Sequence, residues 1–167
     1  MTFDRKKLGA ELVRDEGERL RVYRCTAGKR TVGVGRNLDD VGISAAETAM
    51  LGITVASCIA LGIDQVQSRT LLDNDIVRCE GDLDRALPWW RILNPVRQRV
   101  LLNMCFNMGI GRVGKTGLLS FTNTLARIQR GDFAGAAAGM RASKWHDQVG
   151  KRALRLEAMM ETGKEPA

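Results

Sequence analysis

Residues 16–35, EGERLRVYRCTAGKRTVGVG, decide the fold that we expect for this chain. Apolar and polar side chains alternate at positions 20–23, and a second extended run covers residues 31–35. Such alternation is typical of β-strands, and the segment between the runs contains Gly28, which permits a tight reversal of the backbone. The stretch therefore predicts a β-hairpin that turns at residues 26–29.

The sequence on both sides of the hairpin predicts helices. Before it, apolar residues recur at helical spacing, and Gly17 follows Glu16 where a left-handed cap would end the helix. After it, Ser44 and Asp64 are typical N-cap residues of two further helices. The uncharged run at 48–63 is interpreted as a buried helix, because it is shorter than the roughly 20 residues that span a bilayer.

A central helix is predicted to begin at Asn94-Pro95, an N-cap followed by proline at the first helical position, and to run to Met108. Its residues are apolar nearly all round, which indicates a buried helix. Further helices are expected at 121–129, 133–141 and 151–160. One small hairpin followed by a helical body is an α+β fold, and we expect a single folding unit with two lobes.

Composition and charge limit the function. The 167 residues, 44% of them hydrophobic, suit one globular domain. The net charge of +7 favours a polyanionic or acidic polymer as partner, such as nucleic acid, acidic lipid or peptidoglycan. Four cysteines without a CxxC pair and a single histidine exclude the usual zinc patterns, so we expect reduced thiols. The polar first residues, MTFDRKKLG, lack the apolar core of a secretory signal.

The segment GIGRVGKT at 109–116 formally matches a phosphate-binding loop. Such a loop requires a preceding parallel strand, whereas a predicted helix precedes this one, and no later strand ends in a metal-binding aspartate. We therefore interpret it as a glycine-rich connection between helices. A nucleotide-binding protein that uses this loop is kept as an unfavoured alternative.

Three side chains near the hairpin carry the chemistry that we expect. Cys25 and Thr31 lie symmetrically about Gly28, so we expect them to face each other and to hold a water molecule between them. Glu16 enters from the end of the first helix, where the helix dipole favours the protonated carboxyl group that a general acid needs. An acid, a second polar group and a water-positioning hydroxyl are the parts required for cleavage of a glycosidic bond.

The residues around this group resemble the phage-type lysozyme or endolysin family. The resemblance is carried by Glu16-Gly17, Tyr23, Thr26, Gly28 and the segment TVGVG at 31–35. Eight residues separate Glu16 from Cys25 and five separate Cys25 from Thr31, which is the spacing of the family's Glu, Asp or Cys, and Thr triad. Segments at 103–109, 121–123 and 143–145 resemble family segments in the same order, so the similarity covers essentially the whole chain.

The resemblance implies a lysozyme-like fold in which a hairpin lobe (about 15–65) and a helical lobe (the first helix and 66–167) enclose a cleft. It also implies a muramidase that cleaves the β-1,4 bond between N-acetylmuramic acid and N-acetylglucosamine without metal or cofactor. Glu16 would be the general acid and Thr31 would help to position water. Phe106, Asn107, Thr124 and Trp145 would line the sugar cleft, and Trp145 would pack in the core at its edge.

Cys25 stands where many relatives have an aspartate, and its role stays open. A free thiol has a pKa of about 8.5, and the hypothesis is that the positive field of Arg24, Lys29 and Arg30 increases the thiolate fraction. The thiolate would then act as a general base, which gives inversion, or attack the sugar directly, which gives retention. A catalytically weak peptidoglycan-binding protein of the same fold is the alternative function.

The resemblance has two further implications. Arg36 and Asp75 fall where the family can carry an ion pair that joins hairpin and helix, and at the surface such a pair would contribute only about 0–1 kcal/mol. The protein is expected to be a monomer that acts on peptidoglycan, without nucleic acid and without stable membrane insertion. It would wait in the host cytoplasm, reach the cell wall and periplasm through a separate holin-type pore, and lyse the host.

Overall fold

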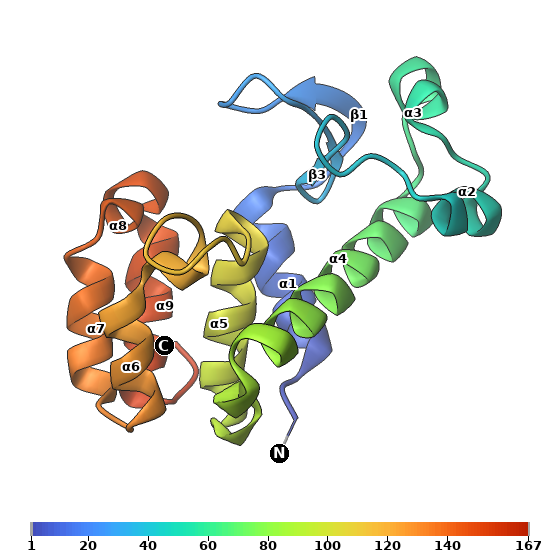
Figure 1. The fold of residues 1–167 in the computed structure, drawn as a ribbon. Helices are drawn as coiled ribbons and strands as arrows, with labels where there is room; N and C mark the ends of the chain where they lie inside the picture. The colour runs from blue at the N-terminus through green and yellow to red at the C-terminus, as the bar shows by residue number, and fades with distance from the viewer. Residues whose placement is uncertain (1, 167) are drawn as a thin grey trace. The chain divides into compact units, whose positions relative to one another are not determined.

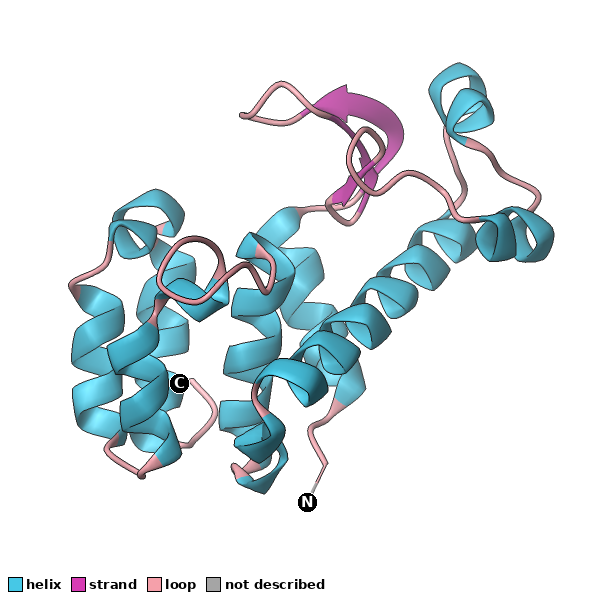
Figure 2. Cartoon of the chain, viewed as in Figure 1, coloured by secondary structure: helices cyan, strands magenta, loops and turns pink. Residues whose placement is uncertain are grey.

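The computed structural model describes residues 2–166 as a mainly helical chain with one small antiparallel sheet (Figures 1 and 2). This confirms the α+β fold class. The chain divides into two compact units, which we call the sheet unit (9–76) and the helical unit (the described parts of 1–8 and 77–167). The sheet unit is longer than the expected hairpin lobe, which covered about residues 15–65. The expectation assigned the first helix to the helical lobe, whereas the sheet unit begins within this helix, at residue 9.

The sheet contains three strands rather than the two of a simple hairpin. Strands β1 (Arg19–Arg24), β2 (Arg30–Gly33) and β3 (Arg36–Asn37) pair in the order β1-β2-β3. The second extended run was expected to reach residue 35, but β2 ends at Gly33. Gly33 and Gly35 have φ angles of +64° and +70°, so the chain turns here and returns as β3.

Helix α1 (Arg5–Glu16) ends where the sequence predicted, because the N–H of Gly17 caps the carbonyl of Val13 at 2.9 Å. Ser44 caps α2 (Ala45–Leu51) through a capping box with Glu47, and α4 (Gln65–Ala86) begins next to Asp64, whose carboxylate accepts from the N–H of Gln67. The core of the sheet unit is formed by Val32, Leu38, Ile53, Cys58, Ile63 and Leu71.

The prediction of one buried helix in the run 48–63 was wrong. Gly52 adopts the left-handed conformation and ends α2, and Thr54 caps a separate helix α3 (Val55–Leu61). Each short helix buries one side only, so Met50 and Leu61 are exposed. No helix among the described residues is long and apolar enough to span a membrane.

The helical unit is organised around α5 (Pro95–Met108), which Asn94 caps and which is buried from Gln98 to Cys105, as its apolar sequence predicted. Helix α9 (Lys151–Thr162) packs against α5, α7 and α8, and α6 packs against α7 (Figure 1). The remaining elements are η1 (Pro88–Ile92), η2 (Leu118–Ser120), α6 (Thr122–Gln129), α7 (Phe133–Arg141) and α8 (Lys144–Val149).

Candidate active site

Glu16 is the last residue of α1, and its side chain lies against the turn between β2 and β3. A Cβ atom built at Gly35 would lie 3.3 Å from Oε2 of Glu16 and 3.5 Å from its Cδ. The absent side chain at position 35 therefore leaves the space that the carboxyl group occupies. The C-terminal end of α1 and the turn at Gly35 together determine the position of the Glu16 carboxyl group.

The hairpin turn differs from the symmetric arrangement that the sequence suggested. The N–H of Gly28 donates to the carbonyl of Cys25 at 2.8 Å, and the N–H of Cys25 donates to the carbonyl of Lys29 at 3.0 Å. Strand pairing places Tyr23 opposite Thr31. The hairpin is thus centred on residue 27 rather than on Gly28, because Gly28 takes the left-handed position at the end of the turn.

Cys25 therefore does not directly oppose Thr31, and that part of the prediction is corrected. Its cross-strand partner is Lys29, two positions before Thr31, so Cys25 and Thr31 are diagonal neighbours on the same face. The Thr31 hydroxyl nevertheless contributes to lowering the pKa of the thiol. It also donates to the carbonyl oxygen of Lys29 at 3.1 Å, and the Thr31 residue is buried.

The pKa of the Cys25 thiol lies below its usual value, chiefly because the backbone N–H of Lys29 stabilises the thiolate. Partial burial opposes this shift, and the N–H of Ala27 and the Thr31 hydroxyl add to it. The direction agrees with the hypothesis from the sequence, but the cause differs. The side chains expected to supply the field are engaged elsewhere: Lys29 with Asp40 at 3.0 Å, Arg30 with Asp39 at 2.6 Å, and Arg24 with the carbonyl of Gly28 at 2.7 Å.

The other three cysteines lie in the protein interior. Cys58, Cys79 and Cys105 are buried, and the four cysteines are free thiols in the structure. Burial raises the pKa of Cys58, and a hydrogen bond with the Cys79 thiol raises that of Cys105. Among the described residues, no group of histidine, cysteine and acidic side chains could hold a metal ion. Cys25 is thus the half-exposed thiol of the chain and has the most accessible thiolate.

Arg36 on β3 forms the predicted ion pair with Asp75 of α4, with a nitrogen–oxygen distance of 2.8 Å. The expectation that this pair is screened at the surface was wrong, because both residues are buried. Glu47 of α2 completes the group and lies 2.8 Å from the same guanidinium. The role of Glu47 was not predicted from the sequence, although a glutamate three residues after Ser44 is the signal of a capping box. The three side chains tie the sheet to two helices.

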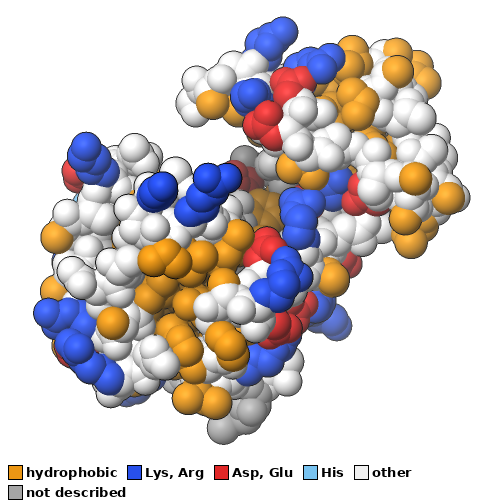
Figure 3. All heavy atoms as spheres, viewed as in Figure 1, with side chains coloured by type: hydrophobic (Ala, Val, Ile, Leu, Met, Phe, Trp, Pro, Cys, Tyr) orange, Lys and Arg blue, Asp and Glu red, His pale blue; other side chains and the backbone are white. Residues whose placement is uncertain are grey.

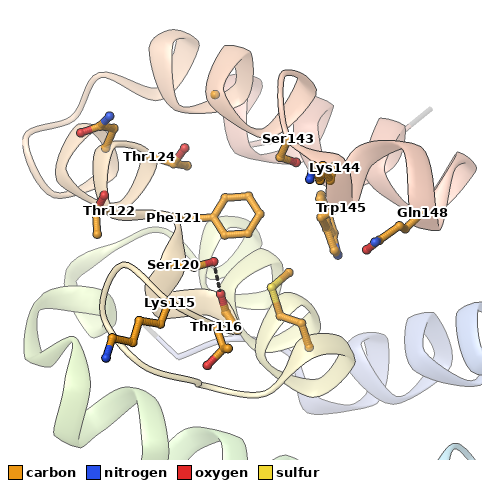
Figure 4. Close-up of a pocket in the computed structure, with 14 residues that line it drawn as sticks. Lys115, Thr116, Ser120, Phe121, Thr122, Thr124, Ser143, Lys144, Trp145 and Gln148 are labelled. Atoms are coloured by element: carbon orange, nitrogen blue, oxygen red, sulfur yellow. Dashed lines mark hydrogen bonds between the residues drawn. The ribbon is translucent and has the colours of Figure 1, made fainter. Parts of the chain in front are cut away.

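The helical unit holds a pocket of about 580 Å³ near the start of α8 (Figure 4). Of the four residues predicted to line the sugar cleft, Thr124 and Trp145 line this pocket. Trp145 is buried, as expected, and its indole N–H donates to Oδ1 of Asn107 at 2.9 Å. Phe106 is half-buried and is not part of the lining.

Further residues of the pocket were not predicted. Figure 4 shows the Phe121 ring between Ser120 and Thr124, and this ring meets Trp145 edge to face with centroids 6.2 Å apart. The other lining residues are mostly small or polar and include Met108, Lys115, Thr116, Gly117, Thr122, Asn123, Gly139, Ser143, Lys144 and Gln148. The segments 121–123 and 143–145 had been noted as motifs, but sequence alone could not show that they share one cavity.

The loop at 109–116 is built as a compact connection between α5 and η2. The backbone N–H groups that a phosphate loop would direct at its ligand donate instead to carbonyl oxygens of residues 112–119; they belong to Arg112, Gly114, Lys115 and Thr116. A Cβ atom at Gly111 would collide with the carbonyl of Thr116. The glycines thus allow close packing of the loop on itself, in agreement with its interpretation as a connection.

Comparison with known proteins agrees with this geometry. The family model described as phage lysozyme matches residues 13–160. The chain is 31% identical over 161 residues to the pre-baseplate central spike protein Gp5 of Enterobacteria phage T4, covering 91% of this chain but only 27% of that protein. It is also similar to two probable T4-type lysozymes of Dictyostelium discoideum, lysozyme 1 (26% identical) and lysozyme 2 (30%); each match covers 89% of this chain and 90% of the relative.

Proposed function

Because this chain belongs to the phage lysozyme family and is a glycoside hydrolase of the lysozyme type, we propose that it cleaves bacterial peptidoglycan. The bond is the β-1,4 link between N-acetylmuramic acid and N-acetylglucosamine. The observation that carries the proposal is that the Cys25 thiol, whose pKa the backbone N–H groups of the turn lower, lies in the same unit as the Glu16 carboxyl group, which occupies the space beside Gly35.

Glu16 is proposed as the general acid. Its proton passes to the bridging oxygen as the bond from that oxygen to the anomeric carbon breaks. The position of Glu16 at the end of a helix, packed against Gly35, supports this role because the carboxyl group is fixed rather than free in solvent. Such fixed placement is what general acid catalysis requires.

Cys25 is proposed as the general base. Its thiolate takes a proton from a water molecule whose oxygen bonds to the anomeric carbon, and the Thr31 hydroxyl helps to orient that water. The lowered pKa of the thiol supports the role because it increases the thiolate fraction near neutral pH. This path inverts the anomeric centre, so the first product is the α-anomer. A β-anomer, observed by NMR, would instead indicate attack by sulfur and a covalent glycosyl-enzyme.

The pocket of the helical unit is proposed to bind the glycan substrate. Thr124 and Trp145 line it, and Asn107 orients the indole of Trp145 through their hydrogen bond. Aromatic and hydroxyl or amide groups together suit a saccharide, which has apolar faces and polar edges. Phe106 is proposed to contribute from α5, outside this pocket.

The decisive experiment measures the clearing of purified peptidoglycan by the wild type and by Glu16→Gln, Cys25→Ser and Thr31→Val. We expect a loss of at least about 100-fold for Glu16→Gln, since a positioned acid contributes about 10²–10⁴-fold. Matched controls are Glu161→Gln, a surface carboxylate of the helical unit, and Thr26→Ala, an exposed neighbour of Cys25. Both should clear walls as the wild type does.

Two results would contradict the assignment. Clearing by Glu16→Gln at the rate of Glu161→Gln would remove the general acid. Wall binding by the wild type without any release of glycan would favour the alternative, a catalytically weak peptidoglycan-binding protein. The biological setting is part of the proposal: the enzyme lyses the host from within, passing from the cytoplasm to the wall through a holin-type pore, as a monomer.

A further inference from the structure

His146, the single histidine of the chain, lies on α8 and has no role in the proposed mechanism. Its ring nitrogen Nδ1 lies 2.6 Å from Oε1 of Glu157 on α9. A carboxylate can only accept a hydrogen bond, so Nδ1 carries the proton and donates it. The ring thus joins α8 to a helix against which α8 packs.

Glu157 is a buried carboxylate that depends on this hydrogen bond. Its side chain is 2% exposed, whereas that of His146 is 25% exposed. Within residues 2–166 its second oxygen, Oε2, accepts no hydrogen bond, and the guanidinium of Arg141 on α7 lies 3.6 Å away. A buried charge that lacks partners is strongly destabilising. The structure therefore favours the position of α8 in which the imidazole reaches Oε1.

Helix α8 contributes much of the pocket of the helical unit. Lys144, Trp145 and Gln148 of α8 line the pocket, and so does its N-cap residue, Ser143 (Figure 4). The helix has only six residues, and isolated helices shorter than about 12–15 residues are marginal in water. The placement of α8 therefore depends on its tertiary contacts rather than on its own backbone hydrogen bonds.

Two neighbouring side chains connect α8 to different helices. The indole N–H of Trp145 donates to Asn107 on α5 at 2.9 Å. The ring of His146 donates to α9. Successive side chains of a helix point about 100° apart, so the two bonds hold α8 from two directions. Together they restrict rotation of α8 about its axis, which would turn the Trp145 indole away from the ring of Phe121 that it meets edge to face.

We propose that His146 is a positioning residue for glycan binding: its bond to Glu157 holds α8 in place and thereby fixes the Trp145 indole in the pocket. The inference rests on the proposed function, in which this pocket binds the glycan. The ring of His146 is directed to α9 and does not line the pocket. We therefore expect it to act through Trp145, and to affect the binding of substrate more than the chemical step.

The first variants separate the hydrogen bond from the bulk of the ring. His146→Leu removes the donor and keeps an apolar side chain. His146→Asn keeps a donor, because the amide nitrogen of asparagine is bonded to Cγ as Nδ1 of histidine is. Asp147→Asn, at an exposed neighbour on the same helix, is the matched control.

Turnover of soluble peptidoglycan fragments measures the effect on binding. We expect His146→Leu to raise KM by about tenfold with kcat within about twofold of the wild type, because an interaction that orders the binding site is lost while the reacting groups are untouched. His146→Asn should restore KM to within about threefold of the wild type, and Asp147→Asn should not change it.

A double variant separates positioning from stability. His146→Leu alone leaves the Glu157 carboxylate buried without its donor, which also destabilises the chain. His146→Leu combined with Glu157→Met removes both partners, and such a replacement by apolar groups is often nearly neutral for stability. We expect the urea midpoint of the double variant to return toward that of the wild type, while its KM stays raised by about tenfold. If His146→Leu does not fold, the double variant decides.

The indole N–H of Trp145 provides a signal that needs no glycan. It is observed in ¹H–¹⁵N NMR spectra and assigned by its loss in Trp145→Phe. His146→Leu and the double variant should shift this signal, because α8 moves relative to Asn107 and Phe121. His146→Asn and Asp147→Asn should leave it at its wild-type position.

An unchanged Trp145 signal in His146→Leu would overturn the proposal, and so would a KM equal to that of Asp147→Asn. Equal impairment of His146→Asn and His146→Leu would also overturn it. Recovery of KM together with stability in the double variant would show that His146 acts through stability alone. Absence of turnover in the wild type would refute the proposed function, and the Trp145 signal would then decide by itself whether His146 places the indole.

Discussion

Cys25 shows how a thiol can occupy the place of a carboxylate in this site. The backbone N–H groups of Lys29 and Ala27 stabilise an anion at this position, so the turn itself favours the charged side chain. Because these donors belong to the backbone, they persist whatever side chain residue 25 carries. The ionisation of Cys25 is thus a property of the hairpin turn, and the flanking cations that the sequence displays are secondary.

Gly35 provides a prediction at the residue scale. Gly35→Ala adds a Cβ atom 3.3 Å from Oε2 of Glu16 and strains a backbone with φ of +70°. Gly52→Ala has nearly the same strain, with φ of +67°, but its Cβ would meet nothing within 4 Å. Both should lose about 1 kcal/mol of unfolding free energy, measured in urea.

The two glycine variants should differ in activity. Gly35→Ala should clear peptidoglycan at least about tenfold more slowly, because a small displacement of a catalytic group has a large effect on rate. Gly52→Ala should retain the wild-type rate. Equal activity of the two would show that the contact between Gly35 and Glu16 has no part in placing the acid.

Residue identities at the site could be predicted, but not their register. Gly28 indicated where the chain reverses direction. Because Cys25 and Thr31 lie three residues before and after Gly28, we expected them to be paired directly across the hairpin. The hairpin is instead centred one residue earlier, because a turn that ends in a left-handed glycine places that glycine off the centre. A shift of one residue in the centre moves the partner by two positions. Cys25 and Thr31 kept their common face and lost only their direct pairing.

At the scale of elements, the buried group of Arg36, Glu47 and Asp75 links β3, α2 and α4. Burial alone would raise the pKa of Glu47, but hydrogen bonds from Arg36, the N–H of Ser44 and Asn74 outweigh it and lower the pKa to about 2. One arginine thus serves two carboxylates in the interior. Removing either partner leaves a buried charge without full compensation, which is costly.

Glu47 leads to a prediction about acid stability. Because its pKa in the folded chain is about 2, against an ordinary value of 4.5, its contribution is complete above pH 4.5 and is lost as the pH falls toward 2. Glu47→Gln should lose about 3 kcal/mol of unfolding free energy at pH 7, and the difference from wild type should narrow below pH 4. Glu161→Gln, at an exposed ion pair, should change stability by less than about 1 kcal/mol. A pH-independent difference for Glu47→Gln would contradict this origin.

Helices were predictable where capping and periodicity agreed. Asn94-Pro95 and the apolar run behind it marked α5, and Gly17 marked the end of α1. The run at 48–63 was interpreted as one buried helix because it carries no charge. Gly52 and the capping residue Thr54, which end one helix and begin the next, were not taken into account. The β3 strand was missed because two residues have no periodicity of their own; it exists through its pairing with β2. Short elements depend on tertiary partners, which sequence patterns do not display.

For the whole molecule, the excess of positive charge is evident both from the sequence and from the surface of the structure. The net charge is +7, and Lys and Arg side chains lie at several separate places on the viewed face of each unit (Figure 3). Many of the cations pair with nearby acids, as Arg30 does with Asp39, so the attraction to an acidic polymer comes from the summed excess rather than from one patch. The excess acts over distance and is therefore sensitive to salt.

This distribution of charge should make the attraction to the cell wall sensitive to ionic strength. Clearing of intact cell walls, which carry stem-peptide carboxylates, should slow several-fold as NaCl is raised from about 20 to about 200 mM, because the Debye length falls to about 7 Å. Hydrolysis of short peptide-free peptidoglycan glycans with amidated carboxyl groups, measured in parallel, should depend much less on salt, since screening acts mainly on the long-range attraction between charges. Equal salt dependence on both substrates would mean that salt acts on the site itself, and that the cationic surface has no part in recruiting the wall.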